Sequence, residues 1–294
     1  MAESFSGGLP IFPDPSRAGR RRSIGCRARI AGRPVQATRW EMPVTESPPH
    51  QAAPHPTLSA YYPEDAQRAG FVRRLFDDTA PHYDRINRLF SLGTGAWYRR
   101  RALRQAGLAP GMRVLDVATG TGLVAREAAR IAGPSGSVLG LDPSAGMLAE
   151  ARRGLAIPLL QGRAESLPLA TGSVDFVSMG YALRHVADLA ATFGEFLRVL
   201  RPGGRVLLLE IGRPDGAWAH TAARAYLGRV VPALCRLGAP RGRSGTLMRY
   251  YWDTIEACVP AETILRHLGQ AGFAEVGCET SLGIFRAYSA RRPG

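Results

Sequence analysis

Short apolar runs alternate with stretches of helical periodicity along most of this chain. The apolar runs lie near Val114, Val138, Leu159, Val174 and Val206, and helical stretches fill the intervals between them. Short apolar runs of this kind are typical of buried parallel strands, and helices are the usual connections between such strands. The pattern therefore predicts an α/β fold built on a single doubly wound, mostly parallel sheet.

The two ends of the chain depart from this alternation. At the C-terminal end, strands are expected at residues 274–280 and 284–290, and their short connection around Leu282-Gly283 predicts an antiparallel hairpin. Three helical stretches are expected ahead of the sheet: one with Phe71, Leu75 and Phe76 at helical spacing, one at residues 83–90, and one at residues 96–106.

Two interruptions are expected late in the chain. Pro202-Gly203-Gly204 predicts a sharp turn that stops a helix and starts a strand at residues 205–211. Residues 213–245 then break the alternation with an amphipathic helical stretch. Its apolar face is expected to contain Tyr226, Val230, Val231 and Leu234. We interpret residues 213–258 as an inserted helical cap over a substrate pocket.

Residues 1–60 are rich in Pro, Gly, Ser and Arg and lack periodicity, so we expect them to be disordered. Order is expected to begin near Glu64, which gives a folded domain at residues 61–294. The extension has the Arg-rich, acid-poor composition of a transit peptide. A start codon assigned too far upstream, with Met42 as the true first residue, explains it as well, and we favour that interpretation.

Composition narrows the function classes. All 38 basic residues are arginine, and the formal net charge is +14. Together with many Ala, Gly and Pro residues, this indicates a GC-rich genome more than a surface selected for nucleic acid. The four cysteines are widely spaced, so we expect no metal site and reduced thiols in a cytoplasmic protein. No apolar run reaches the roughly 18 residues of a membrane span.

The segment that carries the most chemistry is residues 113–123. An apolar strand ends at Asp116 and Val117, a turn contains Gly120 and Gly122, and an alanine-rich helix follows. Glycines allow close approach of a ligand, and the free N–H groups of the helix start favour an anionic group. Dinucleotides and S-adenosylmethionine (SAM) are both bound in this way. Asp142, at the end of the next apolar run, suits ribose hydroxyls in either class.

The end of the chain separates these two cofactor classes. SAM-dependent methyltransferases commonly finish their sheet with an antiparallel hairpin, as expected here. Dehydrogenases usually continue into a second βαβ half or a substrate domain, and too little chain remains for either. We therefore favour a methyltransferase over an NAD-dependent oxidoreductase.

Five further motifs follow one another along the chain. They are Tyr83-Asp84-Arg-Ile-Asn87 with Ser91 and then Trp97, Gly162-Arg-Ala-Glu165-Ser-Leu-Pro168, Tyr181-Ala-Leu183-Arg184-His185-Val186, Arg198-Val-Leu-Arg-Pro202-Gly203-Gly204 through Glu210, and Arg249-Tyr250 with Thr254-Ile255. In this order they resemble the UbiE-type ubiquinone/menaquinone C-methyltransferases, and the resemblance runs from about residue 71 to residue 291. The resemblance implies a Rossmann-like SAM-dependent fold and C-methylation of a polyprenylated benzo- or naphthoquinol ring.

The departures from the family pattern fall mainly on the substrate side. They are Gly95 for a histidine, Leu123 for an often acidic residue, Arg163 for Asn or Asp, His185 for Asn, and Gly212 for serine. A SAM-dependent methyltransferase that acts on another small aromatic or specialised metabolite therefore stays open as an alternative.

The resemblance and the loop chemistry together assign the cofactor side. Asp116, Ala118, Gly120 and Gly122 are expected to bind SAM, with Asp142 on the ribose, Met147 against the adenine, and Arg163 and Ala164 along the adenine edge. Tyr83 resembles the family residue that closes over the cofactor. No metal ligand is expected.

On the substrate side, Arg184 is the leading catalytic candidate. The resemblance implies that it activates the ring hydroxyl, and because an arginine does not readily lose its proton, we expect it to stabilise a phenolate. His185 has the intrinsic pKa of a general base. Asn87, Tyr181, Arg249 and Tyr250 are the further residues expected near the substrate.

A lipid-tailed quinol implies peripheral contact with a membrane, helped by the arginine-rich surface. A homodimer is a second expectation for the same apolar cap. We expect no nucleic-acid partner, because the N-P-P-Y motif of amino-methylating enzymes is absent and no nucleophilic cysteine lies near residues 175–181.

Overall fold

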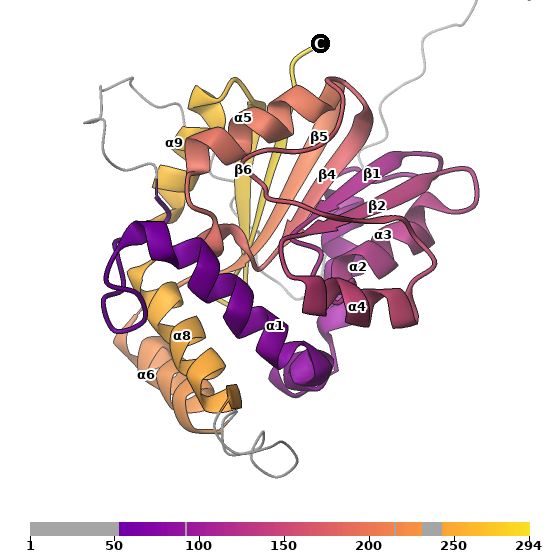
Figure 1. Ribbon diagram of the computed structural model, residues 1–294. Coiled ribbons are helices and arrows are strands. Elements are labelled where there is room, and N and C mark those ends of the chain that lie inside the picture. Colours follow the sequence, from indigo (N-terminus) through magenta and orange to yellow (C-terminus); the bar gives the residue numbers. More distant parts are fainter. Residues whose placement is uncertain (1–52, 92, 215, 231–242) are drawn as a thin grey trace, which may run out of the picture. The chain divides into compact units, whose positions relative to one another are not determined.

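The computed structural model describes residues 53–294, except 92, 215 and 231–242. Its centre is a seven-stranded sheet with the strand order β3-β2-β1-β4-β5-β7-β6 (Figure 1). The strands are β1 (Arg113–Val117), β2 (Ser137–Asp142), β3 (Leu159–Gln161), β4 (Val174–Gly180), β5 (Leu200–Ile211), β6 (Ala274–Ser281) and β7 (Phe285–Arg291). The first five pair in parallel, and β7 pairs antiparallel with β5 and β6. The predicted doubly wound sheet and terminal hairpin are confirmed.

The helices lie on both faces of this sheet and beyond its carboxyl edge. They are α1 (Asp65–Phe90), α2 (Gly95–Gln105), α3 (Leu123–Ala132), α4 (Ala145–Gly154), α5 (Leu189–Val199), α6 (Ala217–Ala225), α8 (Arg243–Ala257) and α9 (Ala261–Gln270). Two short helices are also described, the 3₁₀ helix η1 (Leu183–His185) and the π-helix η2 (Tyr226–Val230).

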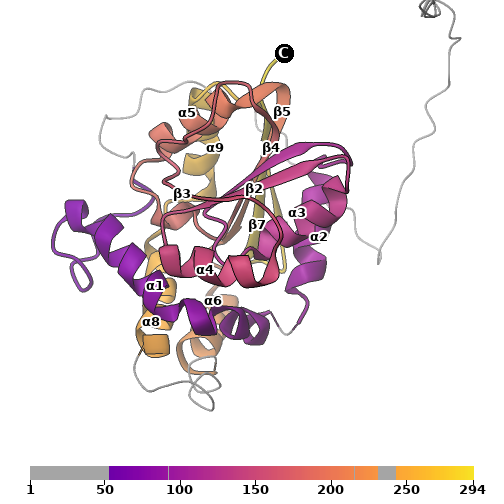
Figure 2. The ribbon, with the colours of Figure 1, turned by 45° about the vertical axis from the view of Figure 1, so that its right-hand side comes forward.

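Alternation along the strands divides the core into two layers. Val114 and Phe176 pack with α2 and α3, whereas their neighbours Leu115 and Val177 pack with α5 and α9. Successive side chains of a strand point to opposite faces, so a strand covered on both sides is apolar at every position. This arrangement explains why the strands read as continuous apolar runs (Figure 2).

The prediction of a sharp turn at Pro202-Gly203-Gly204 is wrong. These residues belong to β5, which begins directly after α5. The pairing shifts from Val174 with Leu200 to Phe176 with Arg205, so β5 advances five residues while β4 advances two. Gly203 has φ +77°, which only glycine adopts without strain. The motif is therefore an irregularity inside a strand that bends without ending it.

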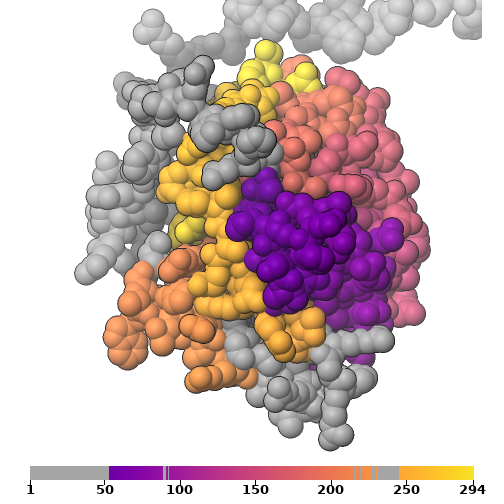
Figure 3. All heavy atoms as spheres, turned by 60° about the vertical axis from the view of Figure 1, so that its left-hand side comes forward, coloured from indigo at the N-terminus to yellow at the C-terminus, as the bar shows by residue number. Residues whose placement is uncertain are grey.

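The two helical stretches expected before residue 91 form one helix. α1 spans 26 residues and contains Pro81, whose ring removes one N–H from the helical hydrogen bonds. α1 crosses the carboxyl edge of the sheet and packs against both α4 and α8 (Figures 1 and 3). A helix of this length can connect two distant parts of the pocket, as described below.

A third apolar cluster joins α1, α8 and the segment of residues 53–62, which we call the N-terminal strap. In the strap, His55 and Tyr62 are each 1% exposed. The Pro54 carbonyl accepts a hydrogen bond from the Val259 N–H at 2.8 Å. The packed domain therefore includes residues that we placed in the disordered extension, because the strap buries aromatic and imidazole rings. The remainder of that extension, with Met42, lies outside the described residues.

The expected apolar face of the insertion is only partly correct. Tyr226 packs against the third cluster, but Val230 is 44% exposed. Residues 226–230 form a π-helix, whose wider turns rotate side chains away from the positions that an α-helical period predicts. Val231 and Leu234 lie outside the described residues.

Candidate active site

The turn between β1 and α3 has the backbone geometry that its sequence predicts. Ala118, Gly120 and Gly122 all have positive φ, at 52°, 58° and 83°. A Cβ atom added at Gly120 would have no protein atom within 4 Å, because this residue faces a cavity. Gly122 is the residue directly before α3, at a helix start without a side-chain cap. The N–H groups of Gly120 and Gly122 donate to Asp142 and to the Thr119 carbonyl, so an anionic ligand group would use other N–H groups at the start of α3.

Asp116 supports this turn from behind. Its carboxylate accepts hydrogen bonds from the hydroxyls of Thr119 and Ser178, both at 2.6 Å, and the residue is 1% exposed. Burial raises the pKa of Asp116 to about 6, although both hydroxyl donors oppose the shift. Neither Asp116 nor Gly122 lies on the cavity wall, so both shape the site rather than line it.

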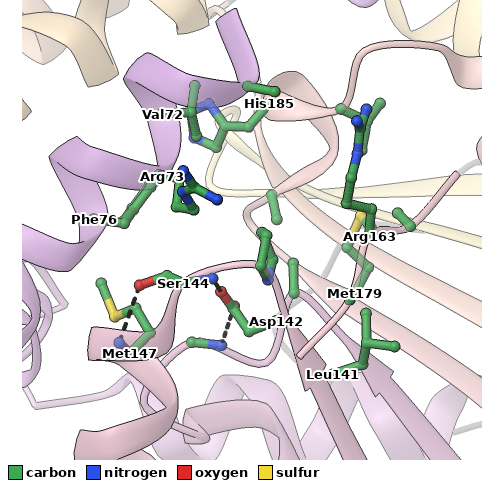
Figure 4. Close-up of a pocket in the computed structure, with 18 of the residues that line it drawn as sticks. Val72, Arg73, Phe76, Leu141, Asp142, Ser144, Met147, Arg163, Met179 and His185 are labelled. Atoms are coloured by element: carbon green, nitrogen blue, oxygen red, sulfur yellow. Dashed lines mark hydrogen bonds between the residues drawn. The ribbon is translucent and has the colours of Figure 1, made fainter. Parts of the chain in front are cut away.

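Asp142 joins the two loops that follow β1 and β2. Its Oδ2 accepts a hydrogen bond from the Gly120 N–H, and its Oδ1 accepts one from the Ser144 N–H, each at 2.8 Å (Figure 4). Burial raises the pKa of Asp142 to about 6, with the carboxylates of Asp116 and Asp77 as smaller contributions. Asp142 lies on the cavity wall at the end of β2, as its predicted ribose role requires.

The cavity has a volume of about 440 Å³, within the range of small-molecule sites. Met147 is 2% exposed and lines it beside Leu141, and Ala164 lines it at 8% exposure. Arg163 also lines it, with a side chain that is 55% exposed and 3.4 Å from Glu165. An apolar wall for a purine, a carboxylate for a ribose and a glycine turn for an anionic end together fit SAM.

Two carboxylates of α1 fasten this helix to the cofactor loops. Asp77 Oδ1 accepts hydrogen bonds from the Ser144 hydroxyl at 2.6 Å and from the Gly146 N–H at 2.9 Å. Asp84 accepts a hydrogen bond from the Thr121 hydroxyl at 2.5 Å. The two positions are two helical turns apart and share a face. Residues of α1 also form one wall of the cavity, including Val72, Arg73 and Phe76 (Figure 4).

His185 lies on the cavity wall opposite the cofactor loops. Its Nε2 is buried and has no hydrogen-bond partner among the described residues. Its Nδ1 is 3.3 Å from the Tyr250 hydroxyl, and the rings of Phe76, Tyr250 and Tyr251 surround the imidazole at centroid distances of 5.4, 5.4 and 6.0 Å. Burial, and then the charge of Arg184, lowers the pKa of His185 well below its ordinary value. The ring is therefore neutral near pH 7.

Arg184 is not on the cavity wall. Its guanidinium is 2.6 Å from a Glu210 carboxylate oxygen and 3.2 Å from the Thr254 hydroxyl, and the residue is 1% exposed. It also lies 4.9 Å from the centre of the Tyr251 ring. Adjacent residues of a 3₁₀ helix point about 120° apart, so η1 directs His185 into the cavity and Arg184 away from it.

Tyr83 and Tyr181 both line the cavity as expected for site residues. The Tyr83 hydroxyl is 2.8 Å from the hydroxyl of Tyr251. Tyr181 has φ +61°, and its ring faces the guanidinium of Arg99 at 5.7 Å. A bulky residue at positive φ carries backbone strain, and such strain clusters at functional sites.

Three residues expected near the substrate do not line the cavity. Asn87 donates a long hydrogen bond of 3.4 Å to the Tyr83 carbonyl one turn earlier in α1. Arg249 is exposed on α8. Tyr250 is fully buried behind His185 and contacts it through its hydroxyl. These positions support the site or lie outside it.

Four residues at the site were not predicted: Asp77, Asp84, Arg68 and Tyr251. Arg68 lines the cavity and donates hydrogen bonds to the strap, to the Tyr62 hydroxyl at 3.2 Å and to the His55 carbonyl at 2.8 Å. Only Asp84 lies in a quoted motif, beside Tyr83. Tyr251 lies within the segment of the last motif, at a position that the motif match does not include, and Asp77 and Arg68 lie outside the motifs, so no local signal identified these three.

A parallel sheet with a terminal antiparallel hairpin, a glycine turn after β1 and a buried aspartate on the cavity wall at the end of β2 together match a SAM-dependent methyltransferase. The sequence profile of the ubiE/COQ5 methyltransferase family matches residues 64–289. The chain therefore belongs to the ubiE/COQ5 methyltransferase family.

Relatives extend this comparison. The chain is 38% identical over 227 residues to the ubiquinone/menaquinone biosynthesis C-methyltransferase UbiE of Syntrophotalea carbinolica, which covers 75% of this chain and 94% of the relative. It is 37% identical over 208 residues to the demethylmenaquinone methyltransferase of Thermus thermophilus, which covers 68% and 91%. A solved SAM-dependent methyltransferase of Thermotoga maritima shares the fold, with 19% identity, a TM-score of 0.53 and coverage of 74% and 99%.

Two negative observations apply to the described part of the chain. No group of three or more His, Cys, Asp or Glu side chains is arranged to hold a metal ion there. None of the helices described combines the length and apolar character that crossing a membrane requires.

Proposed function

We propose that this enzyme methylates a ring carbon of a polyprenylated benzo- or naphthoquinol in ubiquinone or menaquinone biosynthesis. The observation that carries the proposal is the buried Nε2 of His185, which has no hydrogen-bond partner in the described part of the chain and lies on an aromatic cavity wall that also reaches the cofactor loops. The names of the relatives from S. carbinolica and T. thermophilus support the same substrate class.

C-methylation of a quinol needs a nucleophilic ring carbon. SAM, when bound, would supply an electrophilic methyl group from its sulfonium sulfur, and cleavage of that sulfur–carbon bond would leave S-adenosylhomocysteine. Removal of a proton from a ring hydroxyl raises the electron density at the ortho carbon, which forms the new carbon–carbon bond. The methylated carbon then loses its hydrogen and the hydroxyl regains a proton, so one proton is released in total.

We assign the hydroxyl proton to His185 Nε2. A neutral imidazole can accept at Nε2 only if Nδ1 carries the hydrogen, and Tyr250 offers its hydroxyl oxygen as the acceptor for that hydrogen at 3.3 Å. The surrounding aromatic rings exclude water and suit a quinol ring. We therefore propose His185 as the catalytic base and Tyr250 as its positioning residue.

For Arg184 we propose an indirect role instead of direct contact with a phenolate. Its charge is paired with Glu210, and its guanidinium lies against Tyr251, whose hydroxyl bonds to Tyr83. Arg184 thus supports the cavity wall that Tyr83 forms. The cofactor assignments for Ala118, Gly120, Asp142, Met147, Arg163 and Ala164 are retained, with Asp116 and Gly122 shaping the turn. The insertion, through α8, is proposed to cover the substrate.

The test is quinone extraction and mass spectrometry from cells with and without the gene. We expect a quinone that is lighter by one methyl group when the gene is absent. The intact chain should restore the methylated form, and a Gly120→Arg chain should not. An unchanged quinone profile would reject the quinol and favour another small aromatic substrate for the same SAM site. A lipid-tailed substrate further implies contact with a membrane, which we also propose.

A further inference from the structure

The most exposed large apolar side chains of the described residues come from three separate segments. Trp218 at the start of α6 is 90% exposed, Leu282 at the tip of the β6–β7 hairpin is 87% exposed, and Trp97 at the start of α2 is 62% exposed. Val230 and Leu160, at 44% and 39%, follow well behind. Neither tryptophan lines the cavity, although Trp97 belongs to one of the sequence motifs. Single exposed apolar residues are common, but apolar residues that gather in one region can mark an interaction surface.

Contacts within the fold bring the three segments to one region. On one side of the hairpin tip, Tyr98 of α2 packs on Phe285 with ring centroids 5.3 Å apart. On the other side, the Gly212 N–H donates to the Ile284 carbonyl at 2.7 Å, just ahead of α6. The lower end of the yellow hairpin accordingly lies between α6 and α2 in Figures 1 and 2. We call the surface formed by Trp97, Trp218 and Leu282 the tryptophan face.

The helices that carry this face are positively charged. α2, α6 and the adjoining η2 contain no acidic residue. Arg99 is buried and Arg100 pairs with Glu127, but four other arginines of these helices are exposed: Arg101, Arg104, Arg224 and Arg229. The Arg101 guanidinium lies 5.5 Å from the centre of the Trp97 ring. Exposed apolar side chains with arginines nearby complement a surface that has anionic groups outside and an apolar interior.

We infer that the tryptophan face docks this enzyme on an anionic lipid bilayer, with Trp97, Trp218 and Leu282 entering the interface and the flanking arginines contacting lipid headgroups. Tryptophan is enriched at the depth where headgroups meet hydrocarbon. A second protein would more commonly require one contiguous apolar core than three separate tips. The inference rests on the proposed function, since a polyprenyl tail keeps its quinol in a membrane.

The experiment is co-sedimentation of the full chain with vesicles of phosphatidylglycerol and phosphatidylcholine, and with vesicles of phosphatidylcholine alone. We expect binding to the anionic vesicles that weakens as salt increases, because the arginine contribution is screened. Trp218→Ser should weaken that binding about tenfold, since it removes one large apolar group from the interface. Trp218→Ser combined with Leu282→Ser should weaken it further.

Leu160→Ser is the matched control for Leu282→Ser, because Leu160 is an exposed leucine on β3, at the opposite end of the sheet. It should leave vesicle binding unchanged. Leu160→Ser and Leu282→Ser should both keep the SAM affinity and the turnover of a short-tailed, water-soluble quinol, since neither leucine lies at the cavity. Retained turnover with lost vesicle binding supports the inference.

Three outcomes would overturn it: wild-type chain that ignores anionic vesicles, a Trp218→Ser/Leu282→Ser chain that binds them like wild type, or a double variant that changes only the oligomeric state in sedimentation velocity. The last result would assign the face to a second copy of the chain. If instead the wild-type chain bound the anionic vesicles but did not methylate the quinol, the proposed function would be contradicted and the bilayer contact would still hold.

Discussion

The two halves of the cavity are built in different ways. The half that we assign to the cofactor, the cofactor half, consists of two loops at the ends of β1 and β2, and its central link, between Asp142 and Gly120, joins residues 22 positions apart. The half that we assign to the substrate, the substrate half, is assembled from α1, η1 and α8, and its link between Tyr83 and Tyr251 spans 168 positions. A local half depends on turn geometry, whereas a distributed half depends on how whole helices pack. The substrate half can therefore change specificity while SAM binding is conserved.

The largest effect is expected from His185→Gln, on turnover alone. Removal of a general base typically costs about 10²- to 10⁴-fold in rate. SAM affinity, measured by calorimetry, should stay unchanged because His185 belongs to the substrate half. His267→Gln on α9 is the control and should keep full turnover. If His185→Gln keeps the wild-type kcat, another group takes the proton.

Gly120→Arg should act on the other half of the cavity. The side chain would enter the space that the cofactor needs, so SAM affinity should fall by about 100-fold or more, equivalent to about 3 kcal/mol. Gly133→Arg is the matched control. Gly133 also has positive φ, at 66°, and open space around its Cβ, but it follows α3 at the end away from the turn.

Both glycines have positive φ, and Gly133, at φ 66° and ψ −170°, lies in a region that is open essentially to glycine alone, so the Gly133 variant should lose at least as much thermal stability as the Gly120 variant. Only the Gly120 variant should lose SAM. Equal SAM affinities in the two variants would show that Gly120 does not face the cofactor.

A pH series should give opposite slopes for SAM binding and for stability. With a pKa of about 6, Asp142 is mostly ionised at pH 7 and mostly protonated at pH 5. If ribose hydroxyls donate to its carboxylate, SAM affinity should fall about tenfold between these values. Asp142→Asn should bind more weakly at pH 7 and lose most of this dependence, whereas Asp188→Asn, at the start of α5, should keep it.

Stability without cofactor should change the other way. The folded chain holds protons on Asp116 and Asp142 up to about pH 6, whereas these groups in the unfolded chain lose protons near 3.8. Their contribution to the unfolding free energy is therefore fully present below that lower value and decreases as pH rises to about 6. Denaturant unfolding of Asp142→Asn at pH 5 and pH 7 should show a smaller difference than wild type.

The smallest effect is expected where the two halves meet. Asp84→Asn weakens the bond from α1 to Thr121 without removing the acceptor, so SAM affinity should fall only about threefold. The dissociation rate, measured by stopped flow, should rise by a similar factor. Asp78→Asn, an exposed neighbour on the same helix, should not change either quantity. A tenfold or larger loss would mean that α1 belongs to the cofactor half.

This difference also explains what sequence alone could predict. The parallel strands, the hairpin and the glycine turn after β1 each depend on a contiguous stretch of sequence. The fold confirms the strands and the hairpin. Asp77, Asp84 and Tyr251 contact partners 67, 37 and 168 positions away, so they become visible only once α1 and α8 are packed.

Arg184 shows that a sequence motif can place a residue without predicting the direction of its side chain. Its place after β4 predicted a residue at the carboxyl edge, and it does lie there, but the direction of its side chain depends on η1 being a 3₁₀ helix. The rotation of about 120° between successive residues of η1 decides whether Arg184 or His185 faces the cavity. The same limit applies to Val230, where a π-helix replaced the expected period.

The N-terminal strap has a practical consequence for producing this enzyme. The family profile begins at residue 64, which makes a chain shortened to that point an attractive choice for expression. Such a chain would lack His55 and Tyr62, and the buried guanidinium of Arg68 would lose three of its hydrogen bonds. Asp65 and the Val186 carbonyl would remain as partners, but loss of most hydrogen bonds of a buried charge is strongly destabilising. A shortened chain should therefore begin before residue 53.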